Sequence, residues 1–116
     1  MPAPFIVVEG RDVSMFPSLA DLTGWVEATD VRDGIYQAFD AQGRVIELAA
    51  KSDVSAVTAK AGEPAIERLR SLLIDYVVWV GPERVGVTDP EITTLDLATL
   101  VKAIWAFQSR RPRPPA

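Results

Sequence analysis

The sequence predicts an α+β fold, a small antiparallel β-sheet of four or five strands packed against about three helices. The strongest sign of the sheet is the stretch 34–48 (GIYQAFDAQGRVIEL), in which two apolar runs flank a turn-forming Asp-Ala-Gln-Gly. Short β-branched runs precede this hairpin, and two segments with apolar residues every three or four positions follow it. A chain of 116 residues has the length of one domain, so these elements are expected to share a core.

Two strands are predicted before the hairpin. Residues 5–8 (FIVV) form a continuous apolar run, which is typical of a central strand buried on both faces. Residues 9–12 resemble a turn, and residues 13–16 alternate like a second strand. Pro17 is expected to end the sheet there, because proline cannot donate a hydrogen bond to a neighbouring strand.

The hairpin supplies the next two strands, and its turn residues define where they meet. Asp40 suits the first position of a type I turn, and Gly43 can adopt the positive φ of a closing bulge. The return strand is expected over residues 45–49. Residues 54–59 alternate between apolar and polar and predict a further strand, which residues 61–62 would end.

The first helix is predicted between the second strand and the hairpin. Ser18 is a good N-cap, and the apolar residues that follow it fall at spacings of three and four, which gives one apolar stripe. The stripe consists of Leu19, Leu22, Trp25 and Val26. Residues 29–34 (TDVRDG) are a polar connection from this helix to the hairpin.

The longest helix is predicted over residues 63–80. Pro64 is favourable in the first turn of a helix, and residues 81–82 (Gly-Pro) end one in the expected way. Residues 83–91 are predicted to be an irregular connection.

A last helix is predicted to begin at an N-cap, Thr94 or Asp96, and to run to about residue 109. Its inward stripe consists of Leu97, Leu100, Val101, Ile104 and Gln108. Residues 110–116 (RRPRPPA) cannot continue a helix and are expected to be a disordered, basic, proline-rich tail. The sequence therefore predicts a single domain over residues 1–109.

Composition makes a catalytic function improbable. The chain contains neither cysteine nor histidine, which removes the thiol nucleophile, the commonest general base and the commonest metal ligands. No phosphate-binding loop, nucleophile elbow or EF-hand spacing is present. The sequence therefore predicts a protein without a catalytic site, a metal or a cofactor.

Charge and hydropathy restrict the partners. Residues 1–62 carry nine acidic and five basic residues, and three of the remaining seven bases lie in the tail. An acidic body argues against nucleic acid as a partner and favours a basic protein. With no targeting segment and no apolar run near the roughly 20 residues that span a bilayer, a cytoplasmic protein without a membrane contact is expected.

Two groups of residues are candidates for binding a partner protein. The first is acidic and consists of Glu27, Asp30, Asp33 and Asp40, for which the alternative is ordinary turn chemistry at a solvated surface. The second is apolar and consists of Trp105 and Phe107, which widen the last helix beyond its inward stripe. This extra width would suit a homodimer or another partner, whereas the alternative is packing in the core.

The first half of the chain resembles the immunity proteins of bacterial polymorphic toxin systems. The resemblance covers residues 5–48, with the run FIVVEGRDVSMFPSLADLTGWVE followed by the hairpin DGIYQAFDAQGRVIEL in a small acidic domain. It implies a protein that neutralises a toxin by occlusion and presents acidic side chains to a basic nuclease. The basic tail is not part of that pattern.

Three functions follow from these observations. The leading hypothesis is a non-enzymatic protein-binding module, most concretely an immunity protein. A small ligand-binding domain or a carboxylate-based enzyme is the second hypothesis. The third is a structural subunit that homodimerises through the last helix.

Overall fold

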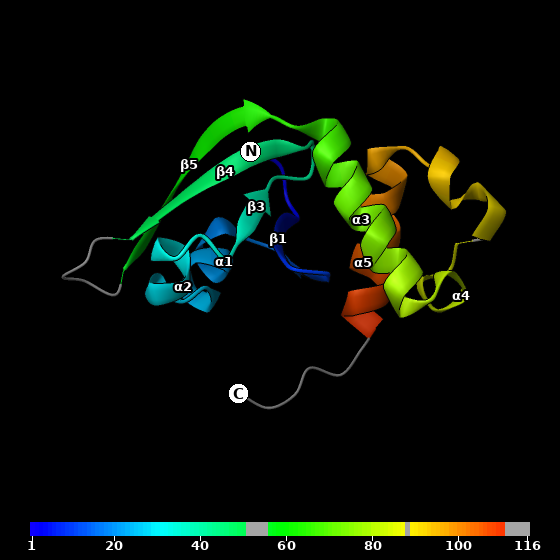
Figure 1. The fold of residues 1–116 in the computed structure, drawn as a ribbon, viewed down its shortest axis with the longest axis horizontal. Coiled ribbons are helices and arrows are strands. Elements are labelled where there is room, and N and C mark those ends of the chain that lie inside the picture. The colour runs from blue at the N-terminus through cyan, green and yellow to red at the C-terminus, as the bar shows by residue number, and fades with distance from the viewer. Residues whose placement is uncertain (51–55, 88, 111–116) are drawn as a thin grey trace.

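The computed structural model describes residues 1–50, 56–87 and 89–110. Five strands form one antiparallel sheet in the order β2-β1-β3-β4-β5, and helices lie on both of its faces (Figure 1). The strands are β1 (Phe5–Glu9), β2 (Asp12–Phe16), β3 (Gln37–Phe39), β4 (Arg44–Ala50) and β5 (Val57–Pro64). The helices are α1 (Leu19–Trp25), α2 (Ala28–Arg32), α3 (Ile66–Val80), α4 (Pro82–Val85) and α5 (Leu97–Arg110), with a 3-10 turn η1 (Asp89–Thr94) before α5. The predicted α+β class is confirmed.

Strand β1 joins the two halves of the core. It pairs with β2 on one side and with β3 on the other, and its first four residues are buried. Ile6 and Val8 point into one hydrophobic cluster, and Phe5 and Val7 point into a second cluster on the opposite face of the sheet. This explains why residues 5–8 are apolar without alternation, and it confirms the prediction of a strand buried on both faces.

The larger cluster lies between the sheet and the pair of long helices α3 and α5. Leu69 and Leu73 of α3 and Leu100 and Ile104 of α5 have no exposed surface, and they pack against Phe39 of β3. The apolar stripes that predicted these helices are therefore largely the faces that they bury, as expected for amphipathic helices. Ile66, in the first turn of α3, was predicted to lie on the apolar face but is 48% exposed.

The smaller cluster lies under α1 and α2, on the other face of the sheet. Leu22 of α1 and the linking residue Val26 are buried there, against Ala38 and Ile46 of the central strands. The two short helices lie together beneath β4 and β5 in Figure 1. Residues 29–32, which were predicted to be part of a polar connection, belong to α2 instead.

The border between β5 and α3 differs from the prediction. Strand β5 extends to Pro64, and α3 begins only at Ile66, whereas the predicted helix began at residue 63. The reason is the pairing with β4, which continues to the Arg44–Pro64 pair. The Ala65 N–H then donates to the Gly43 carbonyl oxygen at 2.7 Å. Residues 54 and 55 of the predicted strand 54–59 lie outside the described residues.

The region between α3 and α5 is also more ordered than predicted. The predicted irregular connection, residues 83–91, overlaps α4 and the 3-10 turn. Asp96 is the N-cap of α5, because its Oδ1 accepts the Thr99 N–H at 2.8 Å. Arg110 was predicted to belong to the disordered tail 110–116 but is the last residue of α5, and the rest of that predicted tail lies outside the described residues.

A side chain of α5 closes the outer edge of β2. The Gln108 amide donates to the Val13 carbonyl oxygen at 2.7 Å and accepts the Met15 N–H at 3.2 Å. The amide thus makes the two hydrogen bonds that a neighbouring strand would make, which protects an edge that could otherwise pair with another chain. Gln108 was predicted to face inward, and its place on the sheet edge explains why a polar residue belongs to that stripe.

Candidate partner-binding surface

The break between α1 and α2 determines which side chains reach the surface at this end of the molecule. Ser18 caps α1, its Oγ accepting the Asp21 N–H at 3.0 Å, and the helix ends at Trp25. Val26 has an extended backbone and is buried, so it holds the link against the sheet. Trp25 was predicted to lie on the inward stripe, but 46% of it is exposed. That prediction was wrong, because α1 ends at Trp25 and the next residue, Val26, is the one buried against the sheet.

Aromatic contacts hold the Trp25 indole in place although almost half of it is exposed. Its ring centroid lies 5.4 Å from that of Phe16, the buried last residue of β2, and 6.0 Å from that of Tyr36. Both pairs are tilted, within the range of favourable aromatic geometries. Ile35, next to Tyr36, is 43% exposed. A fixed indole and an exposed isoleucine thus lie on adjoining segments of the same end of the molecule.

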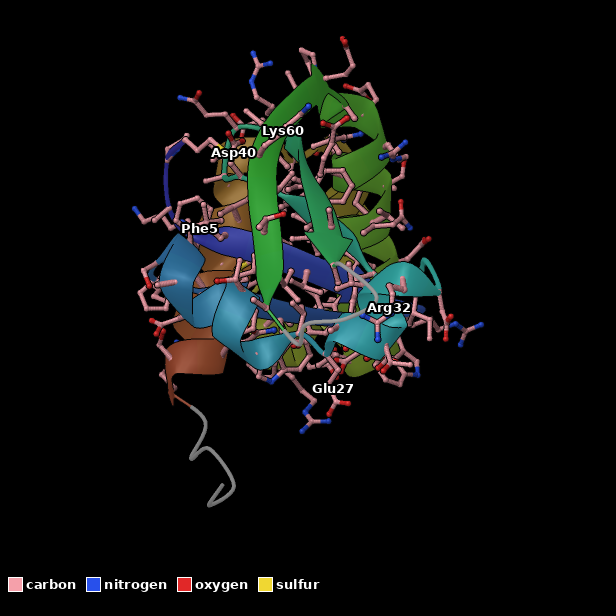
Figure 2. All side chains as sticks on the ribbon, turned by 90° about the vertical axis from the view of Figure 1, so that its left-hand side faces the viewer. Phe5, Glu27, Arg32, Asp40 and Lys60 are labelled. Carbon is pink, nitrogen blue, oxygen red and sulfur yellow. The ribbon has the colours of Figure 1, made fainter. Side chains whose placement is uncertain are left out.

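The Tyr36 hydroxyl ties two acidic residues to these aromatic side chains. It donates to Asp30 Oδ2 at 3.2 Å and accepts the Glu27 backbone N–H at 3.5 Å. Glu27 and Asp33 are exposed, and Asp30 is half-buried. We refer to the group Trp25, Glu27, Asp30, Asp33, Ile35 and Tyr36 as the acidic–aromatic surface. Figure 2 shows Glu27 and Arg32 at this end of the molecule, around α2.

Asp40 does not belong to this surface. It is only 2% exposed, and Figure 2 shows it far from Glu27. Its Oδ1 accepts the backbone N–H groups of Gln42 at 2.9 Å and Arg44 at 3.0 Å. The expectation that Asp40 faces a partner is therefore corrected, because its carboxylate is used inside the hairpin turn.

The two aromatic candidates on the last helix belong mainly to the core. Phe107 is 7% exposed, and Trp105 is half-buried and packs against the larger cluster. Packing in the core, which was the alternative for this pair, therefore accounts for Phe107. The homodimer through the last helix stays a prediction.

No metal centre is apparent in the part of the chain that the structure describes. Within it, no three acidic side chains are grouped closely enough to hold a cation, although Glu27, Asp30 and Asp33 are near in sequence. Among the same residues, no helix is long and apolar enough to cross a membrane.

Comparison of the chain with protein-family models, with curated proteins and with solved structures gave no match.

The acidic–aromatic surface has a measurable titration signature. Burial raises the pKa of the Tyr36 hydroxyl above its ordinary value of 10.0, and the neighbouring Asp30 carboxylate adds to the effect. Because the folded protein holds this proton more tightly than the unfolded chain, the stabilisation is complete below pH 10 and is lost as the pH rises through the raised pKa. In an NMR titration of ¹³C-labelled tyrosine, the Asp30→Asn variant should ionise Tyr36 at lower pH than wild type. Equal titration of the two proteins would contradict the Tyr36–Asp30 contact.

Proposed function

We propose that the protein acts by binding another protein and that the acidic–aromatic surface is the contact. The observation that carries the proposal is the half-exposed Trp25, which aromatic contacts and the hydrogen bonds of Tyr36 hold in one place. Tryptophan and tyrosine are enriched among the residues that dominate binding energy, and a preordered side chain loses little entropy when it is covered.

The charge around Trp25 favours a basic partner. Residues 18–36, which include α1 and α2, contain four acidic residues and one arginine. Exposed acids around an apolar anchor speed the approach of a basic protein and reject acidic ones. Glu27 and Asp33 would supply most of this steering, because both are exposed.

More specifically, we propose that the partner is a toxin. The resemblance to immunity proteins implies occlusion of a basic toxin, and the acidic–aromatic surface has the chemistry that such an occlusion requires. No catalytic step is needed, because covering the toxin's active surface is sufficient for neutralisation.

The proposal is tested by capturing partners from the source cell on two immobilised variants of equal charge. Glu27→Lys with Asp33→Lys reverses the surface and leaves the Tyr36–Asp30 bond intact. Glu63→Lys with Asp75→Lys is the control, since both residues are exposed and lie on β5 and α3. The proposal is supported if wild type and the control each retain a partner in a one-to-one ratio with the immobilised protein and the surface variant does not retain it. Equal retention by both variants overturns it.

The proposal that the partner is a toxin is tested by a separate measurement of toxicity. The captured protein should be harmful when it is expressed alone and harmless when it is expressed together with this chain. A partner that is harmless on its own would contradict neutralisation while leaving the binding surface intact.

A further inference from the structure

A pocket opens at the other end of β2, away from the acidic–aromatic surface. Its volume is about 270 Å³, and it is lined by Asp12, Tyr76, Trp79, Val80, Arg84 and Phe107. These residues come from the start of β2, the last turn of α3, α4 and α5. Phe16, which contacts Trp25, is at the opposite end of the same strand, so the two sites are distinct.

The apolar part of the pocket combines a buried wall with an exposed indole. Phe107 and the Tyr76 ring are buried and belong to the larger core cluster, whereas Trp79 is 54% exposed. An exposed indole beside a hollow with an apolar wall offers a surface on which a ligand's apolar body can pack. The volume lies slightly below the roughly 300 Å³ at which ligand pockets usually begin, which suits a small metabolite rather than a cofactor.

The polar part of the pocket carries both signs of charge. Asp12 and Arg84 are exposed and line the same hollow, yet among the described residues no ion pair joins them. Asp12 Oδ1 accepts the Val13 N–H at 3.1 Å, which fixes the carboxylate. A ligand with a cationic and an anionic group could therefore pair with Asp12 and Arg84 at once.

The Tyr76 hydroxyl adds a third polar group. It is held by Gln108, whose Nε2 donates to it at 3.1 Å. Within the described residues this hydroxyl accepts a hydrogen bond and donates none, so its own hydrogen remains for a ligand anion. The same Gln108 amide makes hydrogen bonds to the β2 backbone. One side chain therefore holds both the Tyr76 hydroxyl of the pocket and the edge of the sheet.

We propose that this pocket binds a small zwitterion with an apolar body, namely a free amino acid with an apolar side chain. Arg84 and the Tyr76 hydroxyl bind its carboxylate, Asp12 binds its ammonium group, and its side chain packs on Trp79 and Phe107. The proposal is independent of the proposed function, since it uses none of the residues of the acidic–aromatic surface.

The test is an NMR titration of the ¹⁵N-labelled full chain with L-leucine and L-phenylalanine, each up to about 10 mM. The Trp79 indole signal should shift and saturate, whereas that of Trp25 should not. Asp12→Asn and Arg84→Gln should each weaken binding about tenfold or more, and Lys102→Gln, at an exposed site on α5, should not. The N-acetyl amide of the same amino acid, which lacks both charges, should fail to bind.

Three outcomes would overturn the proposal. The first is no saturable shift at the highest concentration. The second is binding that survives both Asp12→Asn and Arg84→Gln, which would show that the charges do not recognise the ligand. The third is binding only after removal of residues 111–116, which would make the chain's own basic tail the occupant.

Discussion

Replacing Gly43 with alanine is expected to destabilise the protein by about 3 kcal/mol. Gly43 has a φ of +88°, a backbone conformation that disfavours residues with a side chain. A Cβ at this position would lie 2.9 Å from both Cα and Cγ1 of Ile66 and 3.1 Å from Cδ2 of Leu97. The hairpin turn, the start of α3 and the start of α5 meet here, so the backbone of one element would have to move. Chemical denaturation measures the loss.

Gly10→Ala is the matched control for this substitution. Gly10 also has a positive φ, +62°, but a Cβ there would meet no atom within 4 Å. Its replacement should therefore cost only the backbone term, about 1 kcal/mol. Equal losses for the two variants would contradict the view that close packing against Ile66 accounts for most of the effect at Gly43.

Replacing Asp40 with alanine is expected to cost a similar amount, about 3 kcal/mol. The substitution leaves the N–H groups of Gln42 and Arg44 without the oxygen that accepts both of them, at a buried site. Hydrogen bonds to a charged acceptor are among the stronger ones, and unpaired donors are costly where water has little access. Thermal and chemical unfolding should both report the loss.

Asp40→Asn separates the hydrogen bonds from the charge. Asparagine keeps an oxygen where the carboxylate accepts both N–H groups, so it should retain most of the stability. If Asp40→Asn were as destabilising as Asp40→Ala, the turn would depend on the negative charge rather than on an acceptor. Neither variant should change partner binding, because Asp40 is not on the acidic–aromatic surface.

Local patterns in the sequence were enough to predict most of the fold. The apolar run at residues 5–8 predicted a doubly buried strand, and the recurrence of apolar residues every three or four positions predicted the two long helices. The end of β5 was missed because Pro64 is favourable in the first turn of a helix, whereas pairing with Arg44 keeps it in the sheet. Tertiary pairing outweighed the local preference at that position.

The candidate surface could be predicted only in part. Glu27, Asp30 and Asp33 were chosen as candidates because acidic residues cluster there in sequence, and their role in binding stays a prediction. Trp25 was assigned to the core, because its spacing from Leu22 suits an inward stripe. Gly24 weakens a helix, but it does not show that α1 ends at Trp25. Asp40 has the same charge as the other acids, and only its two backbone donors in the folded hairpin distinguish it.

The measurement that tests the central claim most directly is the kinetics of binding to the captured partner. Glu27→Lys with Asp33→Lys should lower the association rate about tenfold at low salt, and Trp25→Ala should raise the dissociation rate about 30-fold, the equivalent of about 2 kcal/mol. Trp79→Ala, which removes an indole of similar exposure at a distant site on α3, is the control and should change neither rate. If the rates of the surface variants match those of wild type, the acidic–aromatic surface is not the contact.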